Sequence, residues 1–401
     1  MNKWIFLFCF LALPASLFSQ KISGEEVKLL GVENPVSFAL SPDGLRMIVI
    51  DAPKKEPIRV KKLYRPYLES SWGAANPVES LNQKMKPETI VEAPFIDHDG
   101  KNLFFAANFD DSFGGTDLYC CSFHDGICGE PVNLGEPVNS PENESSPTLS
   151  GNRRTLFFTR PAVQKRLELF DTHELWNTEL DSSSTNWLLP QKVNTIVNNG
   201  GLTTVKMAND NHTILYARID NEKDKWQLYW AKRLGDIHWY LPKAIDTLNT
   251  RFSELCPVYC PNDGFIYFLQ NKGTDKRPEC TLYRFPLNNA FVPEKTIVVQ
   301  GTVRDPVDRN PLSANLLVSD PVLGRIKYFT RSNDSDGSFS MILNAGEELM
   351  FHVWEPGYSH VYRRFTPEQT EQNLASSFSL FDSVRLELNI YDREELWPLP
   401  G

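Results

Sequence analysis

Three glutamates occupy equivalent positions in the sequence and could bring their negative charges together at one site. Each stands shortly before a proline: Glu92 before Pro94, Glu144 before Pro147 and Glu254 before Pro257. If these positions start equivalent strands of a ring, the carboxylates converge at one mouth of its central channel, where they would favour a cation or a basic peptide segment. Like charges gathered there would raise the pKa of at least one of them. In the alternative, each carboxylate accepts hydrogen bonds from turn amides of its own repeat.

Motifs for catalysis are missing from the sequence. It contains no GxSxG elbow, no HExxH pair, no P-loop and no glycine-rich dinucleotide turn. No histidine has a second one at ligand spacing, and no nucleophile has a base beside it. We therefore expect no catalytic residues, no enzyme activity and no cofactor.

The segment Asn108–Asp117 is a candidate calcium loop, because Asp110, Asp111 and Asp117 would offer carboxylate oxygens. Their spacing does not match a known calcium loop, so a solvated turn is the alternative and no metal site is expected.

Six cysteines follow the N-terminal region. Cys121 and Cys128 flank a turn and could form a disulfide across a hairpin, with buried free thiols as the alternative. Cys256 and Cys260 would lie about 13 Å apart on one strand, too far to pair with each other.

An internal repeat supplies the elements that position these residues. The segment Glu144–Thr159 has a short extended run, a polar corner and an apolar run, which predicts a hairpin between two buried strands. Versions of it recur at Ser37–Ile50, Glu92–Phe105, Leu202–Ala217 and Glu254–Leu269. Their corners are spaced by about 53 to 58 residues, near the period of propeller blades. A weaker second hairpin follows each copy, so each period predicts a four-stranded blade.

The apolar residues in the second strand of each hairpin are expected to fill the space between blades. They are Phe104, Phe105, Leu156, Phe157, Phe158, Ile214, Tyr216, Ile266 and Phe268.

The predicted fold class is all-β. Residues 26–293 are expected to form a closed β-propeller of five blades, with six as the alternative, and Val27–Ser37 is expected to be the outer strand that closes the ring. In residues 297–392, turns rich in Gly, Pro and Asp separate short strands, which predicts a small β-sandwich. Residues 393–401 are a C-terminal tail.

Residues 1–19 have the layout of a secretory signal peptide, with Lys3, the apolar run Trp4–Leu13 and Ser19 before Gln20. The apolar run is too short to span a membrane, so no transmembrane segment is expected after cleavage. An uncleaved anchor and a lipid anchor at Cys9 are the alternatives. The net charge is −10 and the basic residues are scattered, which argues against nucleic acid as a partner.

Two regions carry a resemblance to known families. GGTDLY (Gly114–Tyr119) and the following stretch Glu130–Ser150 resemble the blade junctions of TolB-like (WD40-like) propeller repeats in Gram-negative envelope proteins. The C-terminal region resembles the carboxypeptidase-regulatory-like (transthyretin-like) domain, through Gly301, Val303, Asp305, Pro311, Leu312, Ala314, Asp336–Phe339, Gly346, Gly357 and Tyr358.

The resemblance implies an exported protein of the periplasm or the outer membrane of a Gram-negative bacterium. In the family, these domains are commonly followed by an OmpA-type domain that holds peptidoglycan, and some members belong to the type nine secretion apparatus. This chain reaches Gly401 without such a domain, so envelope proteins are the expected partners and peptidoglycan is the second candidate. The expected function is a non-enzymatic binding or scaffold protein; the alternative is an envelope hydrolase or lyase with its site at the channel mouth.

Overall fold

The computed structural model describes residues 24–98, 100–124, 126–162, 172–181, 186–193, 195–220, 224–234, 238–287, 292–305, 307–366 and 383–389. The predicted signal peptide 1–19, with Cys9, and the tail 393–401 lie outside these residues. Within them, strands dominate, accompanied by two short helices, α1 (Glu79–Asn82) and α2 (Thr195–Asn198). The predicted all-β class is confirmed.

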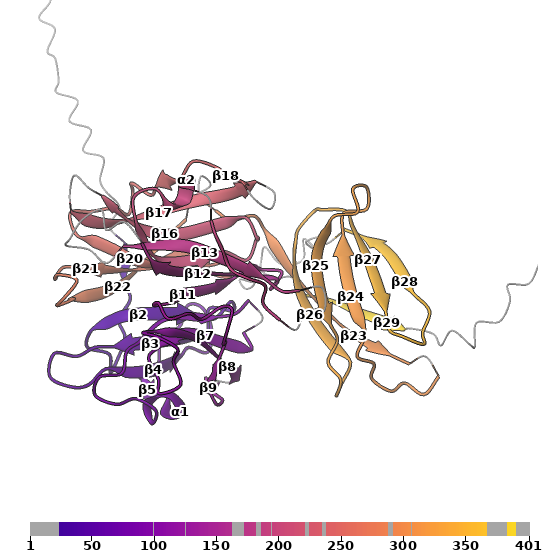
Figure 1. Ribbon diagram of the computed structural model, residues 1–401, viewed down its shortest axis with the longest axis horizontal. Helices are drawn as coiled ribbons and strands as arrows, with labels where there is room; N and C mark the ends of the chain where they lie inside the picture. The colour runs from indigo at the N-terminus through magenta and orange to yellow at the C-terminus, as the bar shows by residue number, and fades with distance from the viewer. Residues whose placement is uncertain are drawn as a thin grey trace, which may run out of the picture.

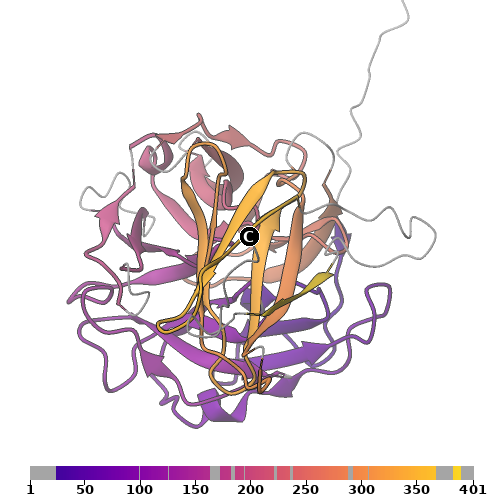
Figure 2. The same ribbon diagram turned by 90° about the vertical axis from the view of Figure 1, so that its right-hand side faces the viewer.

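Antiparallel strands follow one another in sets of four that are arranged radially (Figures 1 and 2). The first set is β2 (Pro35–Leu40), β3 (Arg46–Asp51), β4 (Arg59–Tyr64) and β5 (Asn76–Pro77). The second is β6 (Val91–Ile96), β7 (Asn102–Ala107), β8 (Asp117–His124) and β10 (Val132–Asn133), with β9 (Ile127–Cys128) paired to the end of β8.

The third and fourth sets are joined in one sheet by a single pairing, His173 with Leu202. The third set is β11 (Ser145–Leu149), β12 (Thr155–Pro161), β13 (His173–Glu179) and β14 (Gln191–Lys192). The fourth is β15 (Leu202–Met207), β16 (Thr213–Asp220), β17 (Lys225–Leu234) and β19 (Lys243–Ala244), with β18 (His238–Trp239) at the end of β17.

The last set takes its fourth strand from the start of the chain. β20 (Ser253–Cys260), β21 (Phe265–Asn271) and β22 (Cys280–Pro286) continue into β1 (Glu25–Glu26), which pairs with β22. An N-terminal strand therefore closes the ring, as predicted, but it lies earlier than the expected Val27–Ser37. After Val27 the chain turns at Gly31, whose φ is +82°, and enters β2.

Asn34 forms side-chain hydrogen bonds where the first set of strands meets the last. Its Nδ2 donates to the carbonyl oxygens of Ala52 and Pro278, at 2.9 and 3.0 Å, and its Oδ1 accepts from the backbone N–H of Cys280 at 2.9 Å. One amide side chain therefore ties the first set of strands to the last.

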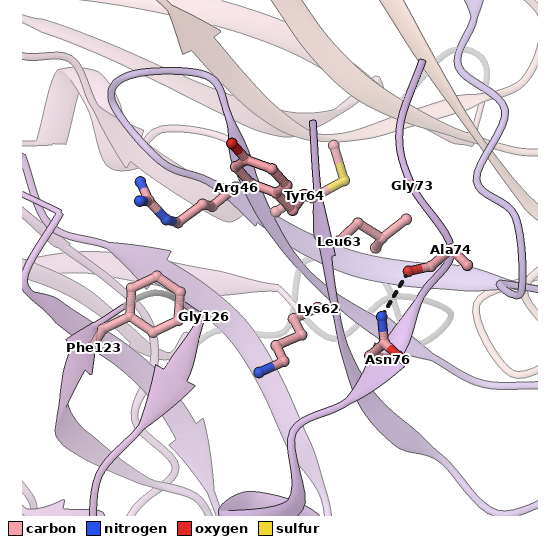
Figure 3. A pocket seen from close by; sticks show the side chains of 10 residues that line it. Arg46, Lys62, Leu63, Tyr64, Gly73, Ala74, Asn76, Phe123 and Gly126 are labelled. Atoms are coloured by element: carbon pink, nitrogen blue, oxygen red, sulfur yellow. Dashed lines mark hydrogen bonds between the residues drawn. The ribbon is translucent and has the colours of Figure 1, made fainter. Parts of the chain in front are cut away.

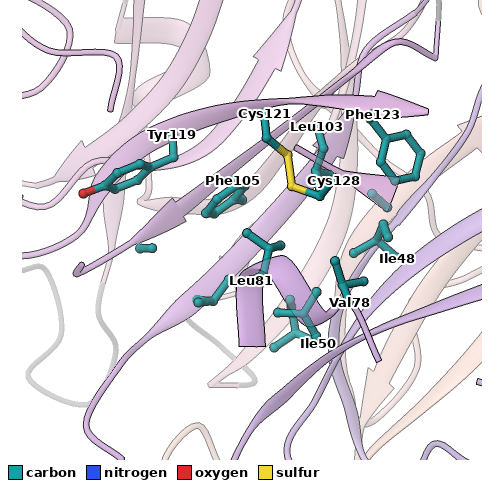
Figure 4. Close-up of a cluster of buried hydrophobic side chains, with 14 of the residues drawn as sticks. Ile48, Ile50, Val78, Leu81, Leu103, Phe105, Tyr119, Cys121, Phe123 and Cys128 are labelled. Atoms are coloured by element: carbon teal, nitrogen blue, oxygen red, sulfur yellow. A yellow bond between two sulfur atoms is a disulfide. The ribbon is translucent and has the colours of Figure 1, made fainter. Parts of the chain in front are cut away.

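Buried side chains fill the seams between neighbouring sets. One cluster joins the first set to the second through residues such as Ile48 and Phe105 (Figure 4), and another joins the first to the last through Met47 and Tyr267. All nine second-strand residues predicted to lie between blades are buried, with at most 7% of each exposed. That part of the prediction is confirmed.

Cys121 and Cys128 form a disulfide with a Cα–Cα distance of 5.8 Å, as the hairpin spacing suggested. Both cysteines are buried in the seam between the first and second sets (Figure 4). Among the described residues, Cys120, Cys256, Cys260 and Cys280 are free thiols, so Cys256 and Cys260 do not pair with each other.

The C-terminal strands form two sheets that share one buried cluster. One sheet has the order β26 (Ser338–Asn344), β23 (Thr296–Arg304) and β29 (Ser383–Asn389). The other has the order β25 (Ile326–Arg331), β24 (Asn315–Ser319), β27 (Leu349–Trp354) and β28 (Val361–Phe365).

These C-terminal sheets lie across one face of the ring (Figure 2). The contacts come from corners of the hairpin repeat: Asn152 donates from Nδ2 to the carbonyl oxygen of Lys327 at 2.9 Å, and the backbone N–H of Glu294 donates to Asp210 at 2.8 Å. The guanidinium of Arg154 also lies 5.6 Å from the ring centre of Phe329. The starts of the inner strands, with the three glutamates, belong to the opposite face.

Candidate functional site

Four inner strands carry the same irregularity near their start. The pairing with the second strand shifts in all five inner strands, and in these four a non-glycine residue with a left-handed backbone lies at the shift. A left-handed backbone at a residue other than glycine is uncommon and costs about 1–3 kcal/mol. Because the bulge recurs in several strands despite this cost, it is a regular element of the repeat, and it changes the direction of nearby side chains. The three glutamates and Lys206 lie within two residues of the left-handed positions: Ala93 (φ 50°), Ser146 (49°), Thr204 (49°) and Cys256 (52°).

Glu144 is fully buried and bound by its own turn. The backbone N–H of Ser140 donates to its carboxylate at 3.1 Å, the Ser140 hydroxyl donates to the other oxygen, and Arg160 donates from Nε at 2.8 Å. Burial raises the pKa of Glu144, while Ser140 and Arg160 oppose that rise. The cause of the raised pKa is therefore burial and not the mutual repulsion that the sequence suggested.

Glu254 repeats this arrangement four residues after Thr250. It is fully buried, and it accepts hydrogen bonds from the backbone N–H of Thr250, at 3.2 Å, and from the Thr250 hydroxyl. Glu92 is half-buried and accepts from the Ser145 hydroxyl of the neighbouring set at 2.6 Å. For Glu144 and Glu254 these bonds match the alternative in which each carboxylate serves its own turn. Binding of a partner by the three glutamates stays a prediction.

Replacing Glu144 or Glu254 by Gln should lower the free energy of unfolding by about 1–3 kcal/mol each, because the amide turns an N–H toward the donors of the turn. Glu92→Gln, at a half-buried position, should cost less than either. Denaturant titration of the single variants measures this difference. Equal, negligible losses at all three positions would contradict the structural role, and a triple Gln variant that folds normally but loses its partners would restore the binding role.

Lys206, which the sequence analysis did not single out, lies buried at the centre of the ring, with 7% of it exposed. Its ammonium donates to the carbonyl oxygen of Pro94 at 2.9 Å and lies 5.4 Å from the ring centre of Phe95. Lys206 belongs to β15 and Pro94 to β6, so this bond links the fourth set of strands to the second. Burial lowers the pKa of Lys206 to about 8.

The Cys256 thiol belongs to the same neighbourhood. Burial raises its pKa to about 11, and the charges of Lys206 and Glu92 act on it in opposite directions. A thiol with a raised pKa is a poor nucleophile at neutral pH. The Lys206 ammonium and the half-buried Glu92 carboxylate therefore both lie near enough to the Cys256 thiol to act on its ionisation.

The cavity around Lys206 holds about 40 Å³. It is lined by residues of four inner strands and by corner residues such as Ser41 and His98, on the face that the C-terminal sheets cross. Small-molecule sites usually have about 300–1,000 Å³, so this end of the channel is too small for a substrate.

A much larger hollow lies between the outer parts of the third and fourth sets. It holds about 550 Å³ and is floored by Phe157, whose ring meets Trp239 edge to face at 6.2 Å. Four large apolar side chains at or next to it are exposed: Leu188 (51%), Leu189 (78%), Tyr240 (55%) and Leu241 (77%). We call this hollow, with these four residues, the rim groove.

The carboxylates of the candidate calcium loop have separate protein partners. Asp110 pairs with Lys86, Asp111 accepts from the Tyr119 hydroxyl at 2.7 Å, and Asp117 accepts from the backbone N–H of Phe113 at 2.9 Å. Over the described part of the chain, no group of three or more His, Cys, Asp or Glu side chains is placed to hold a metal ion.

No helix among the described residues is long and apolar enough to cross a membrane. No protein-family model matches the sequence, and no curated protein matches it. The match to endo-arabinase from Bacteroides thetaiotaomicron VPI-5482 has 12% identity and a TM-score of 0.45, and covers 67% of this chain and 99% of that one. The match to TolB from Acinetobacter baumannii has 11% identity and a TM-score of 0.36, and covers 62% and 54%.

A third match, to α-L-arabinanase from Penicillium chrysogenum, has 12% identity and a TM-score of 0.38 and covers 61% of this chain and 72% of that one.

Proposed function

We propose that this protein is a non-enzymatic scaffold of the cell envelope, exported to the periplasm or the outer membrane, that binds another envelope protein. In this proposal the sets of strands form a five-bladed TolB-like propeller, and the C-terminal sheets form a carboxypeptidase-regulatory-like sandwich. The C-terminal region contacts the ring through hydrogen bonds to Asn152 and Asp210.

The rim groove is the observation that carries this proposal. Contiguous exposed apolar patches often mark sites of protein–protein interaction. Burying one exposed leucine side chain in a complex stabilises that complex by about 1.5–3 kcal/mol. Leu188 and Leu189 of the third set line the groove, and the exposed Tyr240 and Leu241 directly follow Trp239, the lining residue of the fourth set. The partner we propose is an envelope protein that inserts apolar side chains between them.

The ring centre favours binding over catalysis. Its cavity of about 40 Å³ leaves no room for a polysaccharide or peptide substrate, and Glu144 and Glu254 are buried against their own turns. In this proposal the buried polar groups of the channel stabilise the ring, and the partner protein is recognised on the outside of the ring.

The test uses a photo-crosslinking amino acid at Leu189 in the full chain, produced in the native host. We expect a crosslink to one envelope protein, with peptidoglycan scored separately. The double variant Leu188→Asp with Leu241→Asp should abolish it. The matched control puts the same crosslinker at Val322, which is 85% exposed in the turn between β24 and β25.

A crosslink that persists in the double variant, or that forms equally at Val322, would contradict the rim groove as the binding surface. Hydrolysis of an envelope polysaccharide by the purified protein would overturn the non-enzymatic proposal itself.

A further inference from the structure

A second large pocket lies at the seam between the first and second sets of strands (Figure 3). It holds about 530 Å³, and Arg46 and Lys62 are the cationic residues that line it. Among the lining residues that the structure describes, none is His, Cys, Asp or Glu, so they supply no side chain that commonly binds a metal ion. Nitrogen ligands come together instead on the C-terminal sheets.

One face of the four-stranded C-terminal sheet carries aromatic rings. Along β27, Phe351 and Val353 belong to the buried cluster between the two sheets. Because side chains alternate along a strand, His352 and Trp354 lie on the other face. Strand pairing brings Tyr362 of β28 opposite His352, so the β27–β28 hairpin collects three rings on its outer face.

The imidazole of His352 is held by two of these rings. Its ring centre lies 4.3 Å from that of Tyr362, with the two planes 9° apart, and 4.5 Å from that of Trp354, with the planes 24° apart. Stacking against two neighbours restricts rotation of the imidazole. A ligand atom on this ring is therefore positioned before anything binds to it, which is a property of a well-built site.

A second imidazole faces the edge of this ring. His360 directly precedes β28, and its Nδ1 atom lies 3.0 Å from the Nε2 atom of His352. One of these nitrogens donates a hydrogen bond and the other accepts it. The two histidines are eight residues apart in the sequence, and the hairpin brings them together. Within the described part of the chain, no carboxylate or cation pairs with either histidine.

The distance between the two nitrogens indicates a class of ion. Ligand nitrogens about 2.0–2.1 Å from a metal lie about 2.8–3.0 Å apart when they meet it at a right angle, and about 3.3–3.4 Å apart at the tetrahedral angle. The observed 3.0 Å between His352 and His360 therefore matches neighbouring positions of a tetragonal ion. That geometry is typical of Cu²⁺ and Ni²⁺.

We propose that His352 and His360 bind a divalent transition-metal ion, with Cu²⁺ bound most tightly. Imidazole is a good ligand for copper, and Cu²⁺ has the highest affinity of the first-row divalent ions for a given site. On binding, the shared proton moves to the other nitrogen of the donor ring, so both rings stay neutral. The two facing lone pairs then bind the ion, and water fills its remaining positions. This site does not depend on the rim groove, which lies on the ring of strands.

The experiment is titration of the full mature chain, carrying no histidine tag, with Cu²⁺ against glycine as a competing ligand. Electron paramagnetic resonance reports the bound ion. We expect one Cu²⁺ per chain, a tetragonal spectrum and splitting from two imidazole nitrogens. Zn²⁺, titrated in the same way, should bind more weakly.

Two variants each remove one ligand nitrogen. His352→Phe keeps a ring beside Tyr362 and Trp354, and His360→Asn changes an exposed residue, so both should fold. Losing even an outer partner of a metal ligand costs about 10–100-fold in affinity, so losing a ligand should cost at least about tenfold. The matched control is His238→Asn, at an exposed histidine of β18, which should leave Cu²⁺ binding unchanged.

The proposal would be overturned by a chain that binds no Cu²⁺ in competition with glycine, or by a spectrum with fewer than two imidazole nitrogens. Binding that either ligand variant leaves unchanged would also overturn it, and tighter binding of Zn²⁺ than of Cu²⁺ would refute the tetragonal site. Thermal unfolding without metal checks that each variant is folded.

Discussion

Phe157→Ala should lower the free energy of unfolding by about 3–5 kcal/mol, because it removes a large phenyl side chain from the close-packed seam between two sets of strands. Phe157 is 1% exposed and packs between the third and fourth sets of strands with Ile214, Tyr216 and Trp239. Its face also carries the Arg233 guanidinium at 5.7 Å from the ring centre. Truncation therefore removes apolar burial and a cation–π contact together.

Denaturant titration of Phe157→Ala measures this loss, with Phe113→Ala as the matched control. Phe113 is 53% exposed, and its truncation should cost under about 1 kcal/mol. A loss under about 1 kcal/mol for Phe157→Ala as well would mean that the ring faces solvent and that the strand register is shifted by one residue.

The second large effect is a pH dependence that comes from Lys206. Its pKa is about 8 in the folded protein because of burial, against 10.5 ordinarily. Below pH 8 the lysine is charged in both states, and its contribution to stability is constant and unfavourable. Between pH 8 and 10.5 the unfolded chain binds more protons than the folded one, so this group makes stability rise with pH. The full rise is about 3 kcal/mol.

The measurement is the unfolding free energy of the wild type minus that of Lys206→Met, taken from pH 7 to 10.5. The subtraction removes the titration of the many tyrosines and cysteines, and the same difference for Lys55→Met gives the baseline. The Lys206 difference should climb by up to about 3 kcal/mol. A flat Lys206 curve would show that the ammonium stays solvated.

The hairpin repeat made the strands predictable because its alternation of corner and apolar run is local. The sequence pattern therefore predicts Phe157 and its equivalents as seam residues. The disulfide of Cys121 with Cys128 was open to the same reasoning, since both cysteines flank one turn. These features need only contacts between neighbours in the chain.

What the sequence could not show depends on contacts across the ring. Lys206 meets Pro94 across 112 residues, and nothing in the local sequence of β15 indicates that contact. Glu144 is bound by Ser140, four residues earlier, and by Arg160 of the next strand, so its spacing from proline indicated the right strand but not the side-chain direction. The two surface pockets combine residues of different sets, which no repeat alignment brings together.

The closing strand has a consequence for how the ring forms. Glu25 meets Arg284 over 259 residues, so the last seam can seal only after nearly the whole ring has been synthesised. Closing so large a loop carries an entropic cost that must be met before the contacts form, and folds with such distant pairings form slowly. We therefore expect the ring to close late during folding and, under stress, to open first at the β1–β22 edge.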